Sequence, residues 1–184
     1  MKEYWPAERH ALKSQIEPLR QQIVRSFPPS FYFGIVVAGG DDGPWIPSTQ
    51  GDPADDEDLF RMLKHSRWTD VPAAFIDQHL GAFVLLTAPA FAAFIPAWLV
   101  FSLENNLKGA EFVVHTFAPP AGTTQIRPLS IEMFRALTPQ QHRTLHAFLQ
   151  ITATHDRSHL IRERALAAAD AIDKLIAVFE SSRP

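Results

Sequence analysis

The sequence predicts a mostly α-helical protein: a single-domain bundle of several helices around a kinked apolar central helix, with one or two short strands. Two observations lead to this prediction. Apolar residues recur at spacings of three and four in several segments, and one long apolar stretch, Leu80–Leu103, contains prolines at positions that start or bend a helix. A chain of 184 residues most simply forms one domain, because domains typically hold about 100–200 residues. We therefore expect residues 1–184 to form one domain.

The first element is an amphipathic helix. Its predicted inner face consists of apolar residues spaced three or four apart, namely Leu12, Ile16, Leu19, Ile23 and Phe27. Pro18 is expected to kink or split this helix after Glu17, because proline lacks an amide hydrogen and clashes with the preceding turn. Pro28 and Pro29 end it.

A short strand, a loop and an acidic helix are predicted next. Residues 30–40, SFYFGIVVAGG, are rich in aromatic and β-branched residues and close with two glycines, which is typical of a strand. The turn formers that follow predict an exposed loop. Pro53–His65 then reads as a helix, with Asp52 as its N-cap and acidic residues favouring the positive end of its dipole. A shorter helix is expected after Thr69 or Asp70.

The long apolar stretch divides into two elements, Leu80–Leu86 and Ala88–Leu103. Thr87 can cap a helix, and Pro89 fits the first helical turn, where a missing amide hydrogen costs little. The second element is apolar on nearly all sides, which predicts a helix buried on most sides. Pro96 within it predicts a kink.

The same stretch could also be considered as a membrane span, because about 20 apolar residues suffice to cross a bilayer. The break at Thr87 and the acidic flanks Asp77 and Glu104 argue against a span. The N-terminus has charges throughout and no apolar secretory region. We therefore expect a cytoplasmic protein with no membrane partner.

Three elements complete the prediction. Glu111–Phe117 is expected to be a short strand, followed by a loop. Thr138 and Gln141 have the spacing of a capping box, which opens a helix to about Thr152. Arg157–Ser181 is a last amphipathic helix, with alanine, isoleucine and leucine on its inner face.

An ordered set of motifs resembles an uncharacterised bacterial domain family. It comprises an acidic helix start, Trp68, LTAPAF at residues 86–91, IPAWL at 95–99 and FRALTPQQHRTLHAFLQ at 134–150. The resemblance covers about residues 55–152. It departs from the family pattern at Ala88 and Trp98, and the final helix, about 157–181, is longer than expected. The family has no function to carry over. Small bacterial proteins of this kind often accompany toxins as immunity partners, which implies such a role only by association.

The most distinctive surface feature is an acidic segment beside a tryptophan. Between Gly39 and Phe60 there is no Lys or Arg, whereas the net charge of the whole chain is only −3. One interpretation is a solvated loop followed by a helix start that acids stabilise. The other is a docking face for a protein with a basic surface, with Trp45 as its anchor. A divalent-metal site is a third, but the run lacks the order of an EF-hand. The candidate partner-binding residues are Asp41, Asp42, Trp45, Asp52, Asp55, Asp56, Glu57 and Asp58.

Two histidines four residues apart, His142 and His146, are weak candidates for a metal site. The metalloprotease motif needs glutamate directly after its first histidine, but Arg143 stands there. The alternative is that both are packing or surface histidines. The absence of cysteine excludes thiol nucleophiles and cysteine-bound zinc. No nucleophile elbow and no dinucleotide-binding glycine motif is present, so we expect no cofactor.

The function that the sequence favours is that of a non-catalytic interaction protein. Its narrowest form is a bacterial immunity protein that neutralises a cognate toxin by blocking its active surface. The alternative is a metal-dependent enzyme that uses His142 and His146. No nucleic-acid partner is expected, because no helix has the basic density of a DNA-reading element.

Overall fold

The computed structural model describes residues 6–34, 36 and 53–181, with side chains described for 12–34, 36 and 57–181. This part of the chain is helical and contains no strand. The mostly α prediction is therefore confirmed. The elements in chain order are α1 (Pro6–Ser26), α2 (Pro53–Leu63), the 3-10 helix η1 (Trp68–Asp70), α3 (Ala73–Gln78), the 3-10 helix η2 (Ala82–Leu85), α4 (Ala88–Glu104), α5 (Ala110–Phe117), α6 (Pro128–Arg135), α7 (Pro139–His155) and α8 (His159–Ser181).

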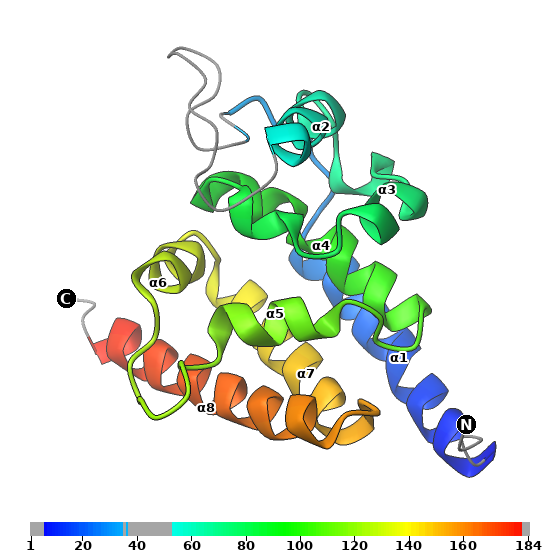
Figure 1. Ribbon diagram of the computed structural model, residues 1–184, viewed down its shortest axis with the longest axis vertical. Coiled ribbons are helices and arrows are strands. Elements are labelled where there is room, and N and C mark those ends of the chain that lie inside the picture. Colours follow the sequence, from blue (N-terminus) through cyan, green and yellow to red (C-terminus); the bar gives the residue numbers. More distant parts are fainter. Residues whose placement is uncertain (1–5, 35, 37–52, 182–184) are drawn as a thin grey trace.

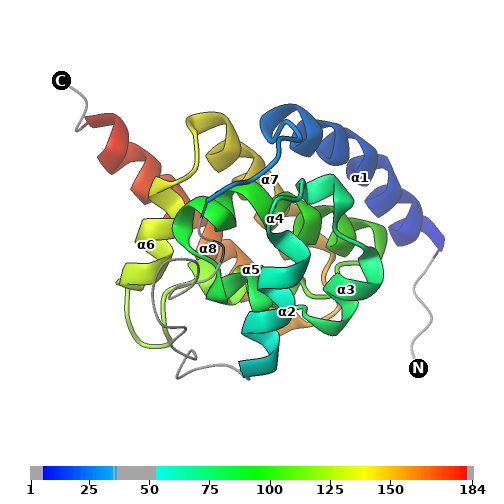
Figure 2. The ribbon, with the colours of Figure 1, turned by 90° about the horizontal axis from the view of Figure 1, so that it is seen from above.

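The helices pack in two connected groups (Figures 1 and 2). In the first, α7 packs along α8, and α5 lies against α8. In the second, α4 contacts α3, η1 and η2. Helix α1 joins the groups because it packs against both α7 and α4, and α6 also contacts α4. None of the described helices has the length and apolar character that a membrane crossing requires.

Helix α4 begins where the sequence predicts. The Thr87 hydroxyl oxygen accepts a hydrogen bond from the Ala90 amide at 3.4 Å, and Pro89 lies in the first turn. The Thr87 amide donates to the carbonyl of Val36 at 3.0 Å, which ties this start to the segment after α1. The apolar stretch is therefore divided as expected, and its first part forms η2. The kink that Pro96 predicts stays a prediction.

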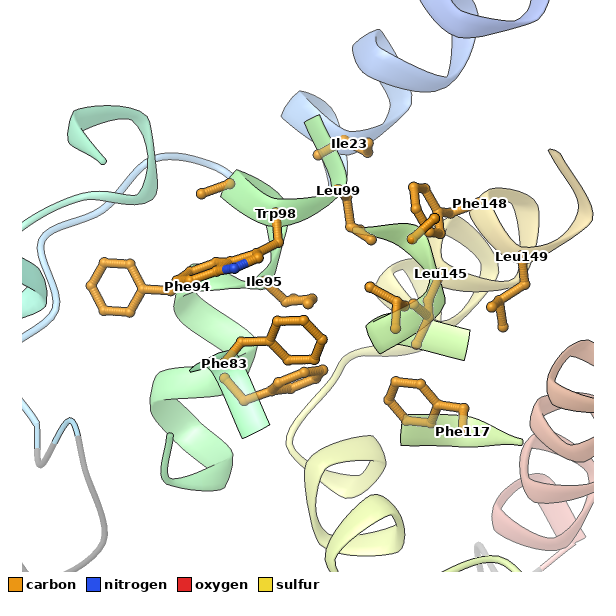
Figure 3. Packing of buried hydrophobic residues seen from close by; sticks show 14 of the residues in the cluster. Ile23, Phe83, Phe94, Ile95, Trp98, Leu99, Phe117, Leu145, Phe148 and Leu149 are labelled. Carbon is orange, nitrogen blue, oxygen red and sulfur yellow. The ribbon is translucent and has the colours of Figure 1, made fainter. Parts of the chain in front are cut away.

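The core is one cluster of buried apolar side chains contributed by helices α1 to α8. Figure 3 shows part of this cluster, with labelled residues from α1, η2, α4, α5 and α7. Aromatic rings on η2 and α4 form part of it. The Phe83 ring lies 5.9 Å from that of Trp98, edge to face, and 6.0 Å from that of Phe91. The Trp98 indole donates to the carbonyl of His79 at 3.1 Å, so its one polar atom is satisfied inside the core.

Two predicted elements differ in the structure. Helix α1 is continuous through Pro18, so the predicted split after Glu17 is wrong, whereas a kink at Pro18 stays a prediction. Pro18 lies on the exposed face, where water can reach the carbonyl that loses its helical donor. Glu111–Phe117 is helix α5 rather than a strand, because the buried residues Val113, Val114 and Phe117 recur at spacings of three and four.

Two further elements differ from expectation. The described part of the predicted strand at 30–40, residues 30–34 and 36, is not a strand, and its other residues lie outside the described part. Helix α6 was not predicted, although Pro128 at its first turn is a helix-start signal. Helices α2, α7 and α8 match the predicted segments to within about three residues at each end.

The capping box of α7 yields a stability prediction. The Thr138 hydroxyl accepts from the Gln141 amide at 3.3 Å, and the Gln141 side-chain oxygen accepts from the Thr138 amide at 2.8 Å. Thr138→Ala is expected to lower the free energy of unfolding by about 1 kcal/mol, because one amide at the helix start loses its acceptor. Urea unfolding followed by circular dichroism measures this change. The control is Thr154→Ala, whose exposed hydroxyl bonds only within α7 to the Gln150 carbonyl. Equal losses in the two variants would contradict the capping role.

Candidate functional site

Of the predicted acidic residues, the structure describes the side chains of Glu57 and Asp58. Both are exposed on α2. Glu57 forms an ion pair with Arg61 one turn along the helix, and the Asp58 carboxylate lies 3.9 Å from Nε2 of His79. Exposed pairs of this kind add little stability, so both carboxylates remain available at the surface.

The remaining members of the predicted set are described less fully or not at all. Asp55 and Asp56 lie in the first turn of α2, where their charge complements the helix dipole. Asp41, Asp42, Trp45 and Asp52 lie outside the described residues. The acidic start of α2 is thus in place, and its juxtaposition with Trp45 stays a prediction.

An exposed aromatic pair, Phe31 and Phe33, lies at the other end of α2. Phe31 is 51% exposed and Phe33 is 74% exposed, whereas Tyr32 between them points inward and packs edge-on against Phe94 with ring centres 5.6 Å apart. The Tyr32 amide donates to the carbonyl of Ser66 at 3.0 Å, which holds the segment against the turn that follows α2.

A guanidinium group and an imidazole ring flank this aromatic pair. The Arg67 guanidinium lies 4.4 Å from the centre of the Phe31 ring, and the His65 ring lies 5.4 Å from that of Phe33. The pair was not predicted as a site, because residues 30–40 were expected to form a strand. The available signal was the alternation of side chains in an extended segment, because it places Phe31 and Phe33 on one side and Tyr32 on the other.

The two candidate metal ligands have other partners. The His142 ring is buried and stacks on Phe134 at 3.7 Å, and its Nε2 lies 2.8 Å from the Phe134 carbonyl oxygen. A carbonyl can only accept, so Nε2 donates and carries the hydrogen. His146 Nε2 lies 3.3 Å from Oδ2 of Asp173. Within the described residues, no group of three or more His, Asp or Glu is arranged to hold a metal ion.

A third histidine, His115 on α5, has a lowered pKa. Burial is the largest cause, followed by the positive charges of Arg164 and Arg127, while Glu111 opposes the shift. Arg127 also donates to the His115 carbonyl at 2.7 Å. These contacts favour the neutral imidazole and join α5 to the start of α6.

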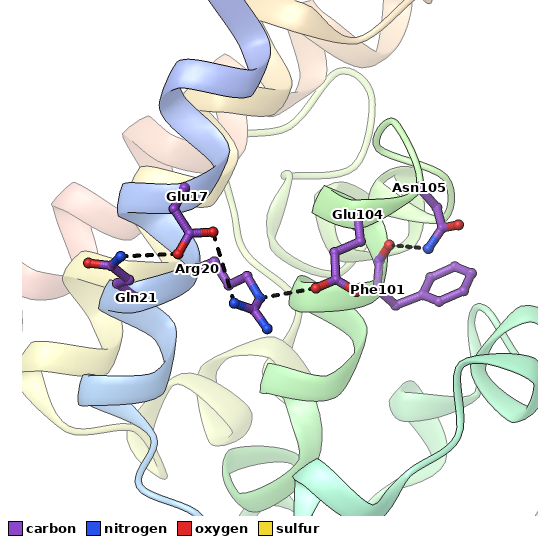
Figure 4. Close-up of polar contacts among 6 residues, drawn as sticks. All are labelled: Glu17, Arg20, Gln21, Phe101, Glu104 and Asn105. Atoms are coloured by element: carbon purple, nitrogen blue, oxygen red, sulfur yellow. Dashed lines mark hydrogen bonds and ion pairs between the residues drawn. The ribbon is translucent and has the colours of Figure 1, made fainter.

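An ion pair connects α1 to the C-terminal end of α4 (Figure 4). Arg20 Nε donates to Oε1 of Glu104 at 3.0 Å, and its Nη1 lies 3.9 Å from Oε2 of Glu17. The Gln21 side-chain amide donates to Oε1 of Glu17 at 3.0 Å. Arg20 and Glu104 lie 84 positions apart in the sequence, which is why no local pattern predicts the pair.

Glu104 lines two cavities. One lies beside residues 12–16 of α1 and the other beside residues 20–24. The larger, which we call the basic cavity, has a volume of about 470 Å³. Its lining residues come from α1, the end of α4 and the end of α7, and are Leu12, Lys13, Ile16, Leu103, Glu104, Asn106, His155 and Arg157. The smaller cavity, of about 310 Å³, lies along α1 from Arg20 to Val24 and is walled mainly by apolar residues of η1, α3 and α4.

The described residues thus form a mostly helical protein with an exposed aromatic pair and a charged cavity. Residues 50–174 match the family of unknown function DUF6714, and the chain belongs to this family. The matched segment contains the predicted family-like segment 55–152 and extends through most of α8. The expected resemblance to an uncharacterised domain family is confirmed at this level. No curated protein and no solved structure is detectably similar to the chain.

Proposed function

We propose that this chain is a non-catalytic protein-interaction protein whose partner has a basic surface. The observation that carries the proposal is the exposed aromatic pair, Phe31 and Phe33, beside a helix with an acidic start. Exposed clusters of large apolar side chains on a folded protein commonly mark interaction sites. Phenylalanine is also enriched at the centres of protein interfaces.

The aromatic pair is held in place before any partner arrives. Tyr32 anchors the segment through its ring contact with Phe94 and through the hydrogen bond that its backbone amide donates to the Ser66 carbonyl. This segment therefore loses little conformational entropy when a partner binds, which favours affinity. Arg67 and His65 flank the pair and surround it with polar groups, and the rim of a protein interface is usually polar.

The acidic residues and the aromatic pair are close enough for one partner to cover both. From Glu57 to His65 the chain advances eight residues along and just past α2, which is roughly 12 Å at the helical rise. A standard interface buries roughly 800 Å² on each partner and spans such a distance easily. In this proposal, the apolar pair fills a pocket of the partner, and Asp55, Asp56 and Asp58 face its basic residues, which accelerates association.

The wider set of Asp41, Asp42, Trp45, Asp52 and Glu57 belongs to the same proposed face. In the narrower form of the proposal, the partner is a cytoplasmic toxin and binding blocks its active surface. This form is motivated by the association of small bacterial proteins with toxins. It predicts that the partner loses its activity when the complex forms.

Affinity capture from the native host, read by quantitative mass spectrometry, tests the proposal. The baits are the wild type, an acid-neutral variant (Asp55→Asn, Asp56→Asn and Asp58→Asn), an aromatic variant (Phe31→Ser and Phe33→Ser) and a control, Leu160→Ser. Leu160 is an exposed apolar residue on α8, 62% accessible. A basic partner is expected with the wild type and the control and to be lost with both face variants, and binding should weaken at high salt.

The captured partner is then purified and titrated against the same four proteins. Equal affinity for all four would refute the proposed face. Loss of binding by the control as well would point to a surface on α8 instead, and would also refute it.

A further inference from the structure

We propose that Arg127 and Arg164 form an anion site at the C-terminal end of α5, and that the site binds a phosphate group, free or carried on a small ester. The site joins three parts of the chain: the end of α5, the residue before α6 and the first half of α8. Figure 1 shows these elements next to one another, and α5 packs on α8. The inference is independent of the proposed partner face, because no residue of that face takes part in it.

Backbone carbonyl groups hold both guanidinium groups at the end of α5. Nη1 of Arg127 donates to the carbonyl of His115, in the last turn of α5, at 2.7 Å. Nη2 of Arg164, on α8, lies 3.5 Å from the carbonyl oxygen of Pro119, which follows shortly after the end of α5. Two cations from separate elements are therefore brought to one place in the fold.

The charge of these two arginines is not balanced locally. Within the described part of the chain, neither forms an ion pair with an Asp or Glu. Their hydrogen bonds go to neutral carbonyl groups and each uses one of the five donors of a guanidinium. Arg164 is half-buried, and its Nε is buried with no hydrogen-bond partner among the described residues. Buried charges are normally paired, so Arg164 needs a counter-charge that a bound anion would supply.

Two neighbouring side chains adjust the charge of the site. The pKa of His115 is lowered, first by burial and then by the positive charges of Arg164 and Arg127, which favours its neutral form. Glu111, one turn earlier on α5, opposes that shift and also opposes an anion. It offsets only one of the two guanidinium charges, so the site remains positive. A phosphate ester has a charge of about −1.5 to −2 at pH 7 and bonds arginine through two oxygens at once.

The start of α6 adds to the positive potential. Helix α6 has Arg127 as its N-cap and Pro128 in its first turn, and none of the described side chains caps it. Its first turn lies against α5, because the Ser130 hydroxyl donates to the carbonyl of Thr116. A helix N-terminus has a partial positive charge that favours an anion. At the end of α5, where the partial charge is negative, Arg127 already occupies one carbonyl.

The alternative is that the two arginines only fasten the connection between α5 and α6. A purely structural role predicts a loss of stability when they are replaced, and no binding of phosphate to the wild type. Binding and unfolding measured on the same variants therefore separate the two roles.

NMR titration of the purified full chain with inorganic phosphate at neutral pH is the first test. Saturable shifts are expected for the His115 ring and for backbone amides at the end of α5, the start of α6 and around Arg164. Acetate has one charge and should bind at least about tenfold more weakly. Phenyl phosphate, titrated in parallel, shows by its relative affinity whether the site prefers free phosphate or an ester.

Charge variants locate the site. Arg127→Gln with Arg164→Gln should weaken phosphate binding by at least about tenfold. Arg164→Lys keeps the charge but not the fork of donors, so it should lose less. The matched control is Arg143→Gln, an exposed arginine on α7, which should leave affinity unchanged. Circular dichroism and urea unfolding check that each variant is folded.

Glu111→Gln is a variant that should gain affinity. It removes the carboxylate that opposes the anion, so phosphate should bind roughly two- to fivefold more tightly. A gain of this kind cannot result from misfolding, so it tests the site even if the double arginine variant does not fold.

Sulfate tests the link to His115, because its charge is constant over the pH range in which histidine titrates. A bound anion favours the charged imidazole, so sulfate should raise the pKa of His115, measured by NMR. By reciprocity, sulfate should bind more tightly as the pH falls through that pKa. His115→Gln should remove most of this pH dependence.

Three results would overturn the proposal: no saturable binding of phosphate at millimolar concentration, full affinity in the double arginine variant, or an unchanged pKa of His115 when sulfate is bound. If the double variant does not fold, the absence of a gain in Glu111→Gln overturns it instead. The partner face and this site have no residue in common, so failure of either proposal leaves the experiments on the other unchanged.

Discussion

Phe91→Ala is expected to lower the free energy of unfolding by about 3–5 kcal/mol, the largest loss that we predict. Phe91 on α4 is fully buried. Its ring lies 6.0 Å from those of Phe83 on η2 and Phe117 on α5. Removing the ring leaves a cavity where three elements meet, and the surrounding rings cannot all move in to fill it.

The matched control is Phe33→Ala, the same substitution at a ring that is 74% exposed. It should change stability by less than about 0.5 kcal/mol, because little apolar surface is removed from the folded interior. Urea unfolding of both variants measures the difference. Similar losses at the two positions would show that the packing around Phe91 is not what stabilises the fold. Because Phe33 is the centre of the proposed partner face, its variant should fold normally and bind poorly.

Helix starts were the most predictable features, because their chemistry is local. The Thr87 hydroxyl accepts from the Ala90 amide and the Thr138 hydroxyl accepts from the Gln141 amide, so each acceptor and its donor lie within four residues of sequence. Such a unit works in the same way whatever packs around it. The start of α2 at Pro53 follows the same logic, with acids that complement the dipole.

Short apolar segments were less predictable, because they fit more than one period. In Glu111–Phe117, the apolar residues suit an extended chain as well as a helix. Packing against α8 decides for the helix. Likewise, proline at position 18 predicts a break, but Pro18 lies on the exposed face of α1, where water can bond to the carbonyl that lacks its helical donor, and the helix continues through it.

The candidate sites also differ in how far the sequence predicts them, for the same reason. The acidic start of α2 could be predicted from the sequence, because the charge of an acidic residue follows from its identity alone. The basic cavity could not, because its lining joins Lys13, Leu103 and Arg157 from three separate elements. The engagement of His142 was equally hidden: its spacing from His146 suggested a ligand pair, but the ring stacks on Phe134 of another helix.

Ala168→Leu is expected to lower the free energy of unfolding by about 1–3 kcal/mol. Four alanines on α8 are buried, namely Ala165, Ala168, Ala169 and Ala171, and α8 packs against α7 and α5. Small side chains allow these helices to approach closely, and a close-packed interior has no room for added carbon atoms. A leucine at Ala168 must therefore push a helix aside or adopt a strained rotamer.

The neighbouring Ala167→Leu is the control, because Ala167 is exposed on the same helix. Alanine and leucine have similar helix propensities, so both variants change the intrinsic stability of α8 by only a few tenths of a kcal/mol. The difference between the two urea midpoints, at equal slopes, therefore measures packing alone. If Ala168→Leu is as stable as Ala167→Leu, α8 is not closely packed on α7 and α5. A large loss confined to Ala168 means that the alanines of α8 set the spacing of the helices. It also means that α8 is packed into the same core as the rest of the family-matched segment, residues 50–174.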